Sequence, residues 1–416
     1  MGLQTFQRTT HRAAILAAVF LGFSIPISTA ANNLTLLLIL VCWLLSGNWP
    51  AKWTRIRANP VALAVFPLVM LAAAGMLWGE GAPSDRWRYF GKYAYLLWIP
   101  ILVSLPLSDG ERHRALLAFV AAMGLTLMLS LMLYFGMLPE GFLPGRGAMN
   151  PTVFKLHITQ GLFMGLAALL AVVFAIHTSR SHFRYLAILF AALAIFDILI
   201  LAGRIGYLAV AIGAIYLFIH YLGRRGLILA LITASVVAGI AIQLQLPAAQ
   251  RIMEGISEIE RWQYGSNDQS SMGLRMQYAA TSFKIIAQHP LAGVGTGGFE
   301  SAYTKQIAST EAGSSNNPHN QYLLTTAQFG IPGLMFLLLI GFAIWRSKAL
   351  LTPPEALMTG GVLLILIVGN FFNSFLYDHS EVVFTAWFFG VMFSNLNYHP
   401  GKDARTAIST PQEKGT

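Results

Sequence analysis

Long runs of apolar residues, separated by short polar stretches, repeat along most of this chain. A membrane-spanning α-helix needs about 20 mostly apolar residues, with roughly 17 to 25 tolerated. Read with a window of that length, the sequence predicts about twelve spanning helices, and therefore an all-α polytopic membrane protein. Their approximate ranges are 13–30, 33–46, 61–78, 94–107, 115–137, 153–177, 185–202, 205–222, 226–246, 330–346, 356–377 and 382–398.

One long hydrophilic stretch, residues 247–329, interrupts these runs. Within it, residues 254–264 and 271–288 have the spacing of amphipathic helices, and Ser271 is placed to be the N-cap of the second. The predicted organisation follows from this stretch. It consists of transmembrane helices 1–9 over residues 1–246, a loop over 247–329, transmembrane helices 10–12 over 330–398 and a cytoplasmic tail over 399–416.

The composition supports a membrane protein and excludes several other classes. Of the 416 residues, 56% are apolar and 11% are charged, whereas soluble domains carry about 25% charged residues. The net charge of +10 does not indicate nucleic-acid binding, because the cytoplasmic loops of membrane proteins collect Lys and Arg. The single cysteine, Cys42, can form neither an internal disulfide nor a thiolate metal cluster.

The distribution of basic residues predicts the orientation of the chain. With both ends in the cytoplasm, every predicted inside loop contains Lys or Arg, and the 247–329 loop lies on the outer side. Other basic residues fall on the outer side, where this rule does not require them, and acidic residues such as Glu258 could pair with some of them. The outer basic residues are Arg86, Arg88, Lys92, Arg146, Lys155, Arg204, Arg251, Arg261, Arg275, Lys284 and Lys305.

Two of these arginines are candidates for binding an anion. Arg204 lies between two apolar runs with almost no loop to hold it, and an arginine at membrane depth is usually paired with an anion or lines a cavity. The alternative is an arginine that reaches the headgroup level. Arg275 is predicted in the first turn of the second amphipathic helix, where the positive end of the helix dipole would add to its charge. The alternative for Arg275 is a solvated surface residue.

His319 is the candidate for proton transfer. It lies in Asn316-Asn317-Pro318-His319-Asn320, directly before an amphipathic stretch that runs into the tenth predicted span. With Asn317 as the N-cap and Pro318 in the first position, His319 would lie in the first helical turn at the membrane surface. A neutral imidazole there could accept a proton. The alternative is a polar interfacial residue.

The sequence offers no metal or nucleotide motif. The glycines of residues 289–299 are not followed by Gly-Lys-Ser/Thr, so this run is interpreted as a shaped turn that ends a helix and positions the loop. No His-Glu-x-x-His or cysteine ligand set is present, and Asp378-His379-Ser380-Glu381 is best explained as a polar turn. We therefore expect neither a metal nor a cofactor.

These residues together resemble the O-antigen ligase and O-antigen polymerase superfamily of bacterial envelope glycosyltransferases. The matching features are Gly203-Arg204 between two spans, Gly273-Leu274-Arg275, the run 289–295 and Asn317-Pro318-His319-Asn320. The resemblance implies a GT-C-like fold in the bacterial inner membrane, with a large periplasmic loop. It also implies a metal-independent enzyme that takes a glycan from undecaprenyl diphosphate and transfers it, in ligases, to the lipid A-core during lipopolysaccharide biosynthesis.

The resemblance assigns roles to the candidate residues. The diphosphate-binding arginines of the family fall on Arg204 and Arg275, and its periplasmic histidine falls on His319, which would act as the general base of an inverting transfer. Secondary candidates for phosphate groups of the donor or acceptor share the outer side and a positive charge. They are Arg86, Arg88, Lys92 and Arg146.

Two other functions remain open from the sequence. An O-antigen polymerase would use the same donor with a second lipid-linked glycan as acceptor. A transporter of lipid-linked glycans would share the spans, but it should carry charged or broken helices in both halves. Only Asp197 is clearly intramembrane, and the sequence assigns it no role. The sequence also leaves the glycan, the acceptor position and the oligomeric state undetermined.

Overall fold

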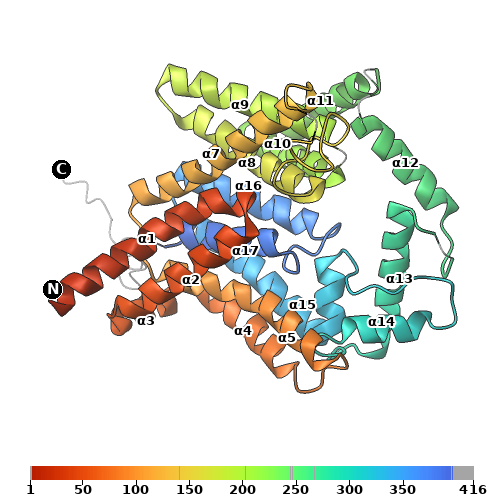
Figure 1. Ribbon diagram of the computed structural model, residues 1–416, viewed down its shortest axis with the longest axis horizontal. Coiled ribbons are helices and arrows are strands. Elements are labelled where there is room, and N and C mark those ends of the chain that lie inside the picture. Colours follow the sequence, from red (N-terminus) through yellow and green to blue (C-terminus); the bar gives the residue numbers. More distant parts are fainter. Residues whose placement is uncertain are drawn as a thin grey trace, which may run out of the picture.

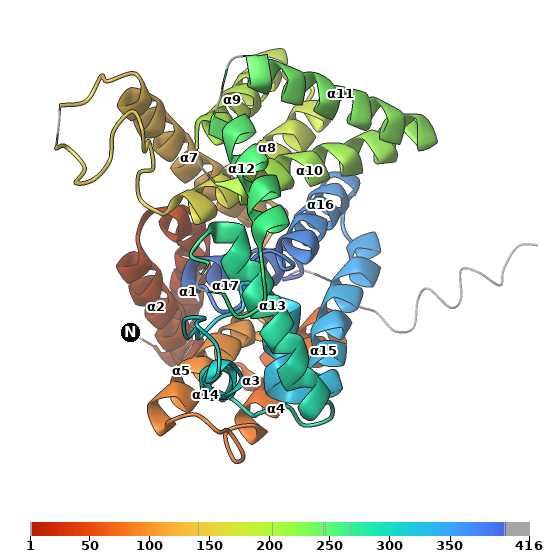
Figure 2. The same cartoon turned by 90° about the vertical axis from the view of Figure 1, so that its right-hand side faces the viewer.

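In the computed structural model, the described residues are 2–139, 141–201, 203–243, 245, 247–266, 268–394 and 396. Over this part of the chain every regular element is a helix, apart from one isolated β-bridge between Gly147 and Asn150. Most helices form one bundle, and three of them, from the 247–329 stretch, lie together along one side (Figures 1 and 2). The predicted tail over 399–416 lies outside the described residues.

Six helices in the described part of the chain are long and apolar enough to cross a membrane, and a bent pair would make a seventh. The six begin with α1 (Leu3–Ile27), α7 (Asp109–Tyr134), α8 (His157–His177), α9 (Ser181–Ile200) and α10 (Arg204–Leu222), and end with α15 (Gln321–Ser347) together with its 3₁₀ extension η2 (Lys348–Leu350). The bent pair is α2 (Thr29–Leu45) and α3 (Trp49–Ala58), which meet at 117°. The predicted count of about twelve spans is thus not confirmed.

The remaining helices explain the difference in count, because several apolar runs are broken into short pieces. The run predicted at 61–78 forms α4 over only 15 residues, which ends before Gly75. The run at 94–107 forms a 3₁₀ turn and the six-residue α6, in which Pro100 has no amide hydrogen to continue the ladder. These helices are α4 (Pro60–Ala74), α5 (Pro83–Ala94), η1 (Tyr95–Leu97), α6 (Trp98–Val103), α11 (Arg224–Gln243), α12 (Pro247–Arg261), α13 (Ser271–Gln288), α14 (Phe299–Ile307), α16 (Pro353–Gly369) and α17 (His379–Met392).

Helix α17 forms the centre of the bundle (Figures 1 and 2). All of its residues except His379 and Thr385 are buried, and its indole Trp387 donates a hydrogen bond of 2.8 Å to the carbonyl of Ala18 on α1. A Cβ at Gly22, one turn further along α1, would lie 2.6 Å from the ring of Trp387. The central helix therefore packs at close range against the first helix of the chain.

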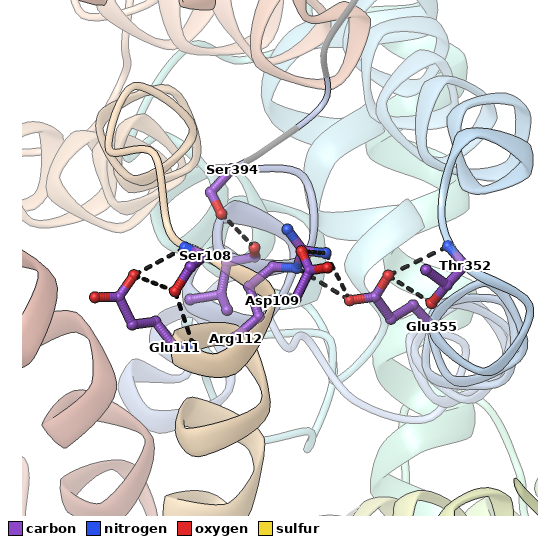
Figure 3. Close-up of polar contacts among 8 residues, drawn as sticks. Ser108, Asp109, Glu111, Arg112, Thr352, Glu355 and Ser394 are labelled. Atoms are coloured by element: carbon purple, nitrogen blue, oxygen red, sulfur yellow. Dashed lines mark hydrogen bonds and ion pairs between the residues drawn. The ribbon is translucent and has the colours of Figure 1, made fainter.

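A buried ion pair fixes one end of the bundle. Arg112 of α7 contacts Glu355 of α16 at 2.9 Å and Asp109 at 3.0 Å, and its side chain is only 7% exposed (Figure 3). Both helices begin with a capping box, in which Ser108 and Thr352 exchange hydrogen bonds with a glutamate three residues later. These contacts hold the first turns of α7 and α16 side by side.

The glycine-rich run after α13 joins the side helices to the bundle. The amides of Val294 and Gly295 donate to carbonyls of α15, at 2.9 Å each, and the amide of Thr296 donates to Gly75 at the end of α4. A Cβ at Gly293, where φ is +60°, would lie 2.3 Å from the backbone of Gln328. As the sequence predicted, this run is a shaped turn that positions the loop.

The same turn packs into a break in α15. At Gly330 the backbone leaves the helical region, with φ 65° and ψ −163°, and the next amide, of Ile331, donates to the carbonyl of Pro290 at 2.8 Å. The break separates a first segment, Gln321–Phe329, from the predicted tenth span, which follows it. The first segment lies on the side of the bundle that carries α12, α13 and α14, which we call the side helices (Figures 1 and 2).

Candidate active site

Helix α13 carries Arg275 in its second turn. The predicted bounds of this helix, 271–288, are confirmed, but its N-cap is Ser270 and not Ser271. The side chain of Ser270 accepts a hydrogen bond of 3.1 Å from the amide of Gly273, and Asp268 holds the amide of Ser270 at 2.8 Å. Burial lowers the pKa of Arg275, and the nearby charge of Arg204 lowers it further, while that of Glu258 raises it.

Arg204 is the first residue of α10, directly after its N-cap Gly203. Its guanidinium lies 3.8 Å from the carboxylate of Glu258 on α12, and both side chains are mostly buried. The guanidinium also lies over Gly255, where an added Cβ would lie 3.2 Å from Cζ of Arg204. Gly255 and Glu258 are three residues apart on one face of α12, so this face holds Arg204 against α13.

Glu258 connects the two arginine-bearing helices. One of its carboxylate oxygens, Oε2, accepts a hydrogen bond of 2.9 Å from the amide of Met272 in the first turn of α13 and is the same atom that contacts Arg204. The carboxylate thus links the first turn of α13 to Arg204 at the start of α10. In the sequence, Glu258 was only one of several acidic residues of the outer side.

His319 is not in the first turn of a helix, which corrects the sequence prediction. Helix α15 begins three residues later than expected, because Asn320, and not Asn317, is its N-cap and accepts from the amide of Leu323 at 3.0 Å. Asn317 instead accepts from the amide of His319 at 3.0 Å, and His319 takes a left-handed conformation with φ 51°. Ser374 donates to the same oxygen of Asn317 at 2.7 Å, which fixes this turn.

A chain of hydrogen bonds orients the imidazole of His319. Its Nδ1 lies 3.2 Å from Oδ1 of Asn373, and the amide nitrogen of Asn373 donates to Asp378 at 3.0 Å. Because the amide nitrogen of Asn373 is used by Asp378, its oxygen faces His319, and Nδ1 of the neutral imidazole must be the donor. This tautomer leaves Nε2 able to accept a proton. Burial raises the pKa of Asp378, and the charge of His319 opposes that rise.

Tyr278 connects the histidine to the arginine site. Its ring lies 6.0 Å from the ring of His319, centroid to centroid, and it follows Arg275 by three residues on α13. Residues three apart share one face of a helix. One face of α13 therefore borders both Arg275 with its partners and the imidazole of His319, so α13 connects the three residues singled out from the sequence.

The four secondary candidates have different surroundings. Arg86 donates to the carbonyls of Gly81 and Met76 in the connection between α4 and α5, at 2.9 and 3.2 Å. Arg88 pairs with Asp85 at 2.9 Å and Glu300 at 3.4 Å, and Arg146 donates to Thr152 in its own loop. The ammonium of Lys92 reaches the surroundings of His319. It lies 5.3 Å from the ring centre of Tyr377, and its charge lowers the pKa of Asp378.

Asp197 has a structural position that the sequence could not assign. Its buried carboxylate accepts hydrogen bonds from Ser130 of α7 and Gln160 of α8, and Ser130 also donates to the carbonyl of Pro151 at 2.6 Å. Gln160 accepts from the amide of Val153 at 2.8 Å. Asp197 thus joins three spanning helices to the loop that precedes α8.

No group of three or more His, Cys, Asp or Glu side chains in the described part of the chain is arranged to hold a metal ion. The amides of Val294, Gly295 and Thr296 in the glycine-rich run donate to carbonyls of α15 and of Gly75 at the end of α4, so the fold itself uses these three amides. The side chains described around the site offer guanidinium, imidazole, carboxyl, amide, phenol and ammonium groups.

Fold and site together define a class: an all-helical membrane protein in which two arginines and a histidine border one helix, α13. Residues 189–338, which include Arg204, Arg275 and His319, match the family model described as O-antigen ligase. The resemblance found in the sequence is confirmed, and proteins of this family are glycosyltransferase-like enzymes that act on lipid-linked glycans. A search of curated proteins finds no match to the chain.

Proposed function

We propose that this chain is an O-antigen ligase of the bacterial inner membrane. It transfers a glycan from undecaprenyl diphosphate to the lipid A-core oligosaccharide on the periplasmic side. The observation that carries the proposal is the shared face of α13, where Arg275 lies beside Arg204 and Glu258, and Tyr278 one turn away contacts the ring of His319. An anion site and a proton acceptor thus border the same helix.

Arg204 and Arg275 bind the diphosphate of the donor. A lipid diphosphate carries at least two negative charges, and guanidinium groups form paired, charge-assisted hydrogen bonds with phosphate oxygens. The position is already suited to an anion, because Glu258 lies beside Arg204 at 3.8 Å and accepts a helix amide at 2.9 Å. A phosphate oxygen that replaced this carboxylate would meet the same donors.

His319 acts as the general base. Its Nε2 accepts the proton of the acceptor hydroxyl while the hydroxyl oxygen attacks the anomeric carbon of the donor glycan. The bond between that carbon and the diphosphate oxygen breaks, and its electron pair leaves with undecaprenyl diphosphate. The two guanidinium groups stabilise this charge as it develops. The attack comes from the face opposite the leaving group, so the anomeric configuration inverts, and the proton later passes from His319 to water.

The reaction as proposed needs no metal, because the arginines neutralise the leaving group themselves. Lys92 is the secondary residue best placed to contact a phosphate of donor or acceptor, since it lies beside Tyr377 near the imidazole. Arg86, Arg88 and Arg146 remain further candidates for such contacts, although each already has a partner in the protein.

The test uses the purified full chain with undecaprenyl-diphosphate glycan and lipid A-core in EDTA, followed by gel analysis of the lipid products. We expect glycan on the lipid A-core with the native chain and none with His319→Ala. The control is His289→Ala, which should keep the activity because His289 is an exposed residue at the end of α13. Glycan that lengthens on undecaprenyl diphosphate without reaching the core would instead identify a polymerase. Movement of the intact donor across a vesicle membrane, without transfer, would identify a transporter.

A further inference from the structure

A second concentration of positive charge lies at the other end of the molecule, where α1 begins and α2 bends into α3. A pocket of about 350 Å³ opens there, at the lower end of the range typical of ligand sites. In Figure 1 the N-terminus and α3 lie at the left, and α12–α14 lie at the right. Among the residues that line the pocket are Gln7, Arg8, His11, Gly47, Lys52 and Arg55.

The charges of this pocket are all of one sign. Arg8, Lys52 and Arg55 line it together with His11, and no lining residue is acidic. Within the described part of the chain, no carboxylate lies within 4.0 Å of Arg8, Lys52 or Arg55. The charge of Glu111 does act on His11, but its carboxylate accepts from the amide and hydroxyl of Ser108, at 2.8 and 2.7 Å. Arg8, Lys52 and Arg55 thus bring three positive charges to the pocket, and the nearby Glu111 offsets them only in part.

Lys52 is the most unusual member of the group. Its residue is only 4% exposed, and its ammonium donates to the carbonyl of Trp43 and lies 4.8 and 4.5 Å from the ring centres of Trp43 and Trp49. A buried ammonium is normally paired with an anion. Here a carbonyl and two aromatic faces hold it in the pocket wall, where a bound anion would complete its surroundings.

The backbone around the pocket is shaped for it. Gly47 and Asn48 both have left-handed φ values, 61° and 53°, and they turn the chain through the 117° bend between α2 and α3. A Cβ at Gly47 would lie 2.6 Å from the side chain of Gln7, so the bend packs closely on α1. The positive-inside rule accounts for basic residues on this side of the membrane, but it does not require them to share one concave surface.

We propose that this pocket binds the phosphate headgroup of an anionic phospholipid. Basic pockets beside membrane helices suit such headgroups. The surroundings favour a lipid over free phosphate, because α3 presents Trp49 and Trp53 at its surface, 47% and 48% exposed, as interfacial anchors do. Leu44 and Leu45, exposed at the end of α2, provide an apolar surface for acyl chains next to the charged pocket.

The test measures the thermal stability of the purified full chain in detergent as dioctanoyl phosphatidylglycerol is added. Dioctanoyl phosphatidylcholine and inorganic phosphate serve as separate comparisons. We expect stabilisation by phosphatidylglycerol alone. Removing one cation, in Arg8→Gln or Arg55→Gln, should raise the half-saturating lipid concentration about fivefold. The matched control is Arg57→Gln on the same helix, whose guanidinium lies 4.9 Å from the ring of Trp53 and outside the pocket.

Three outcomes would overturn the proposal. Equal stabilisation by phosphatidylcholine would show that binding does not depend on the net charge of the headgroup. Equal stabilisation by inorganic phosphate would identify a simple anion site without a lipid. An unchanged half-saturating concentration in Arg8→Gln would exclude the pocket itself, and this variant is the safer one because Arg55 also donates to the carbonyl of Ser104 at 3.2 Å. The melting temperature of each variant without lipid reports whether it is folded.

Discussion

The carboxylate of Glu258 lies 3.8 Å from the guanidinium of Arg204 and accepts a hydrogen bond from the first turn of α13 with the same oxygen. In the absence of donor, the proposed diphosphate site thus contains a negative group that belongs to the protein. A donor diphosphate must displace this carboxylate or share the two arginines with it. The charge of Glu258 therefore opposes donor binding, although its oxygen helps to hold α12 against α13.

Glu258→Gln separates these two effects, because a glutamine oxygen can still accept from Met272 while the charge is removed. We expect the KM for the lipid-linked donor to fall about two- to fivefold, since partly exposed ion pairs are worth up to roughly 1 kcal/mol. Steady-state transfer assays at varied donor concentration measure this change. Glu260→Gln, on the exposed side of the same helix, should leave the KM unchanged. A higher donor KM in Glu258→Gln would show that the carboxylate supports donor binding.

Replacing either proposed diphosphate arginine by lysine should fail to preserve activity. Lysine keeps the charge but loses the paired donors of the guanidinium, and Arg275 lies in a partly buried position where that loss is not made up by water. We expect kcat/KM to fall about a hundredfold in Arg204→Lys and in Arg275→Lys. Arg261→Lys, an exposed arginine of α12, is the control. Activity near that of the native chain in both lysine variants would contradict a paired guanidinium contact.

Asn373 is expected to position His319. In Asn373→Ala the imidazole loses the acceptor that fixes its Nδ1 tautomer, so kcat should fall about ten- to a hundredfold while the donor KM stays constant. The pH profile of kcat should also move, which a purely structural defect would not cause. The control is Asn316→Ala, because Asn316 contacts Tyr89 through its main-chain carbonyl. An unchanged kcat and pH profile in Asn373→Ala would remove the asparagine from the mechanism.

Two buried carboxyl groups near His319 should make stability depend on pH. Burial raises the pKa of Asp378 and of Glu381 above their ordinary values of 3.8 and 4.5. The folded chain thus keeps protons that the unfolded chain has already released. The free energy of unfolding must therefore fall as the pH rises from about 4 through the raised pKa values.

Thermal unfolding across the acid and neutral range measures this dependence. Glu381→Gln carries no titrating proton at this position, so its melting temperature should fall less as the pH rises from acid to neutral. Thr159 donates to Glu381 at 2.6 Å, and a glutamine oxygen can still accept that bond. Glu311→Gln, at an exposed position, should behave as the native chain does. If Glu381→Gln and the native chain lose stability in parallel, the raised pKa is not the cause.

The sequence predicted those features that depend on neighbours along the chain. The bounds of α13 follow from its apolar spacing, and the turn after it follows from its glycines. Both predicted caps were wrong, because Ser270 and not Ser271 caps α13, and Asn320 and not Asn317 caps α15. A second contact holds each cap: the amide of Ser270 donates to Asp268, and the side-chain amide of Asn320 donates to the carbonyl of Phe371.

Contacts between distant segments could not be predicted in the same way. Asn373 follows His319 by 54 residues, and no local pattern indicates that its amide faces the imidazole. Glu258 is one of several acidic residues in a polar stretch, and only the fold brings it to Arg204. The predicted number of spans is not confirmed for a related reason, since an apolar run of spanning length can also form short helices such as α4 and α6.

Arg275 and Tyr278 lie within one turn of a single helix, and this restricts where residues can be inserted or deleted without loss of function. One residue inserted between them would rotate Tyr278 by about 100° around the axis of α13, away from the imidazole. The same insertion between α12 and α13, or after α14, would only lengthen a connection. Insertions should therefore be tolerated in these connections but not between positions 275 and 278.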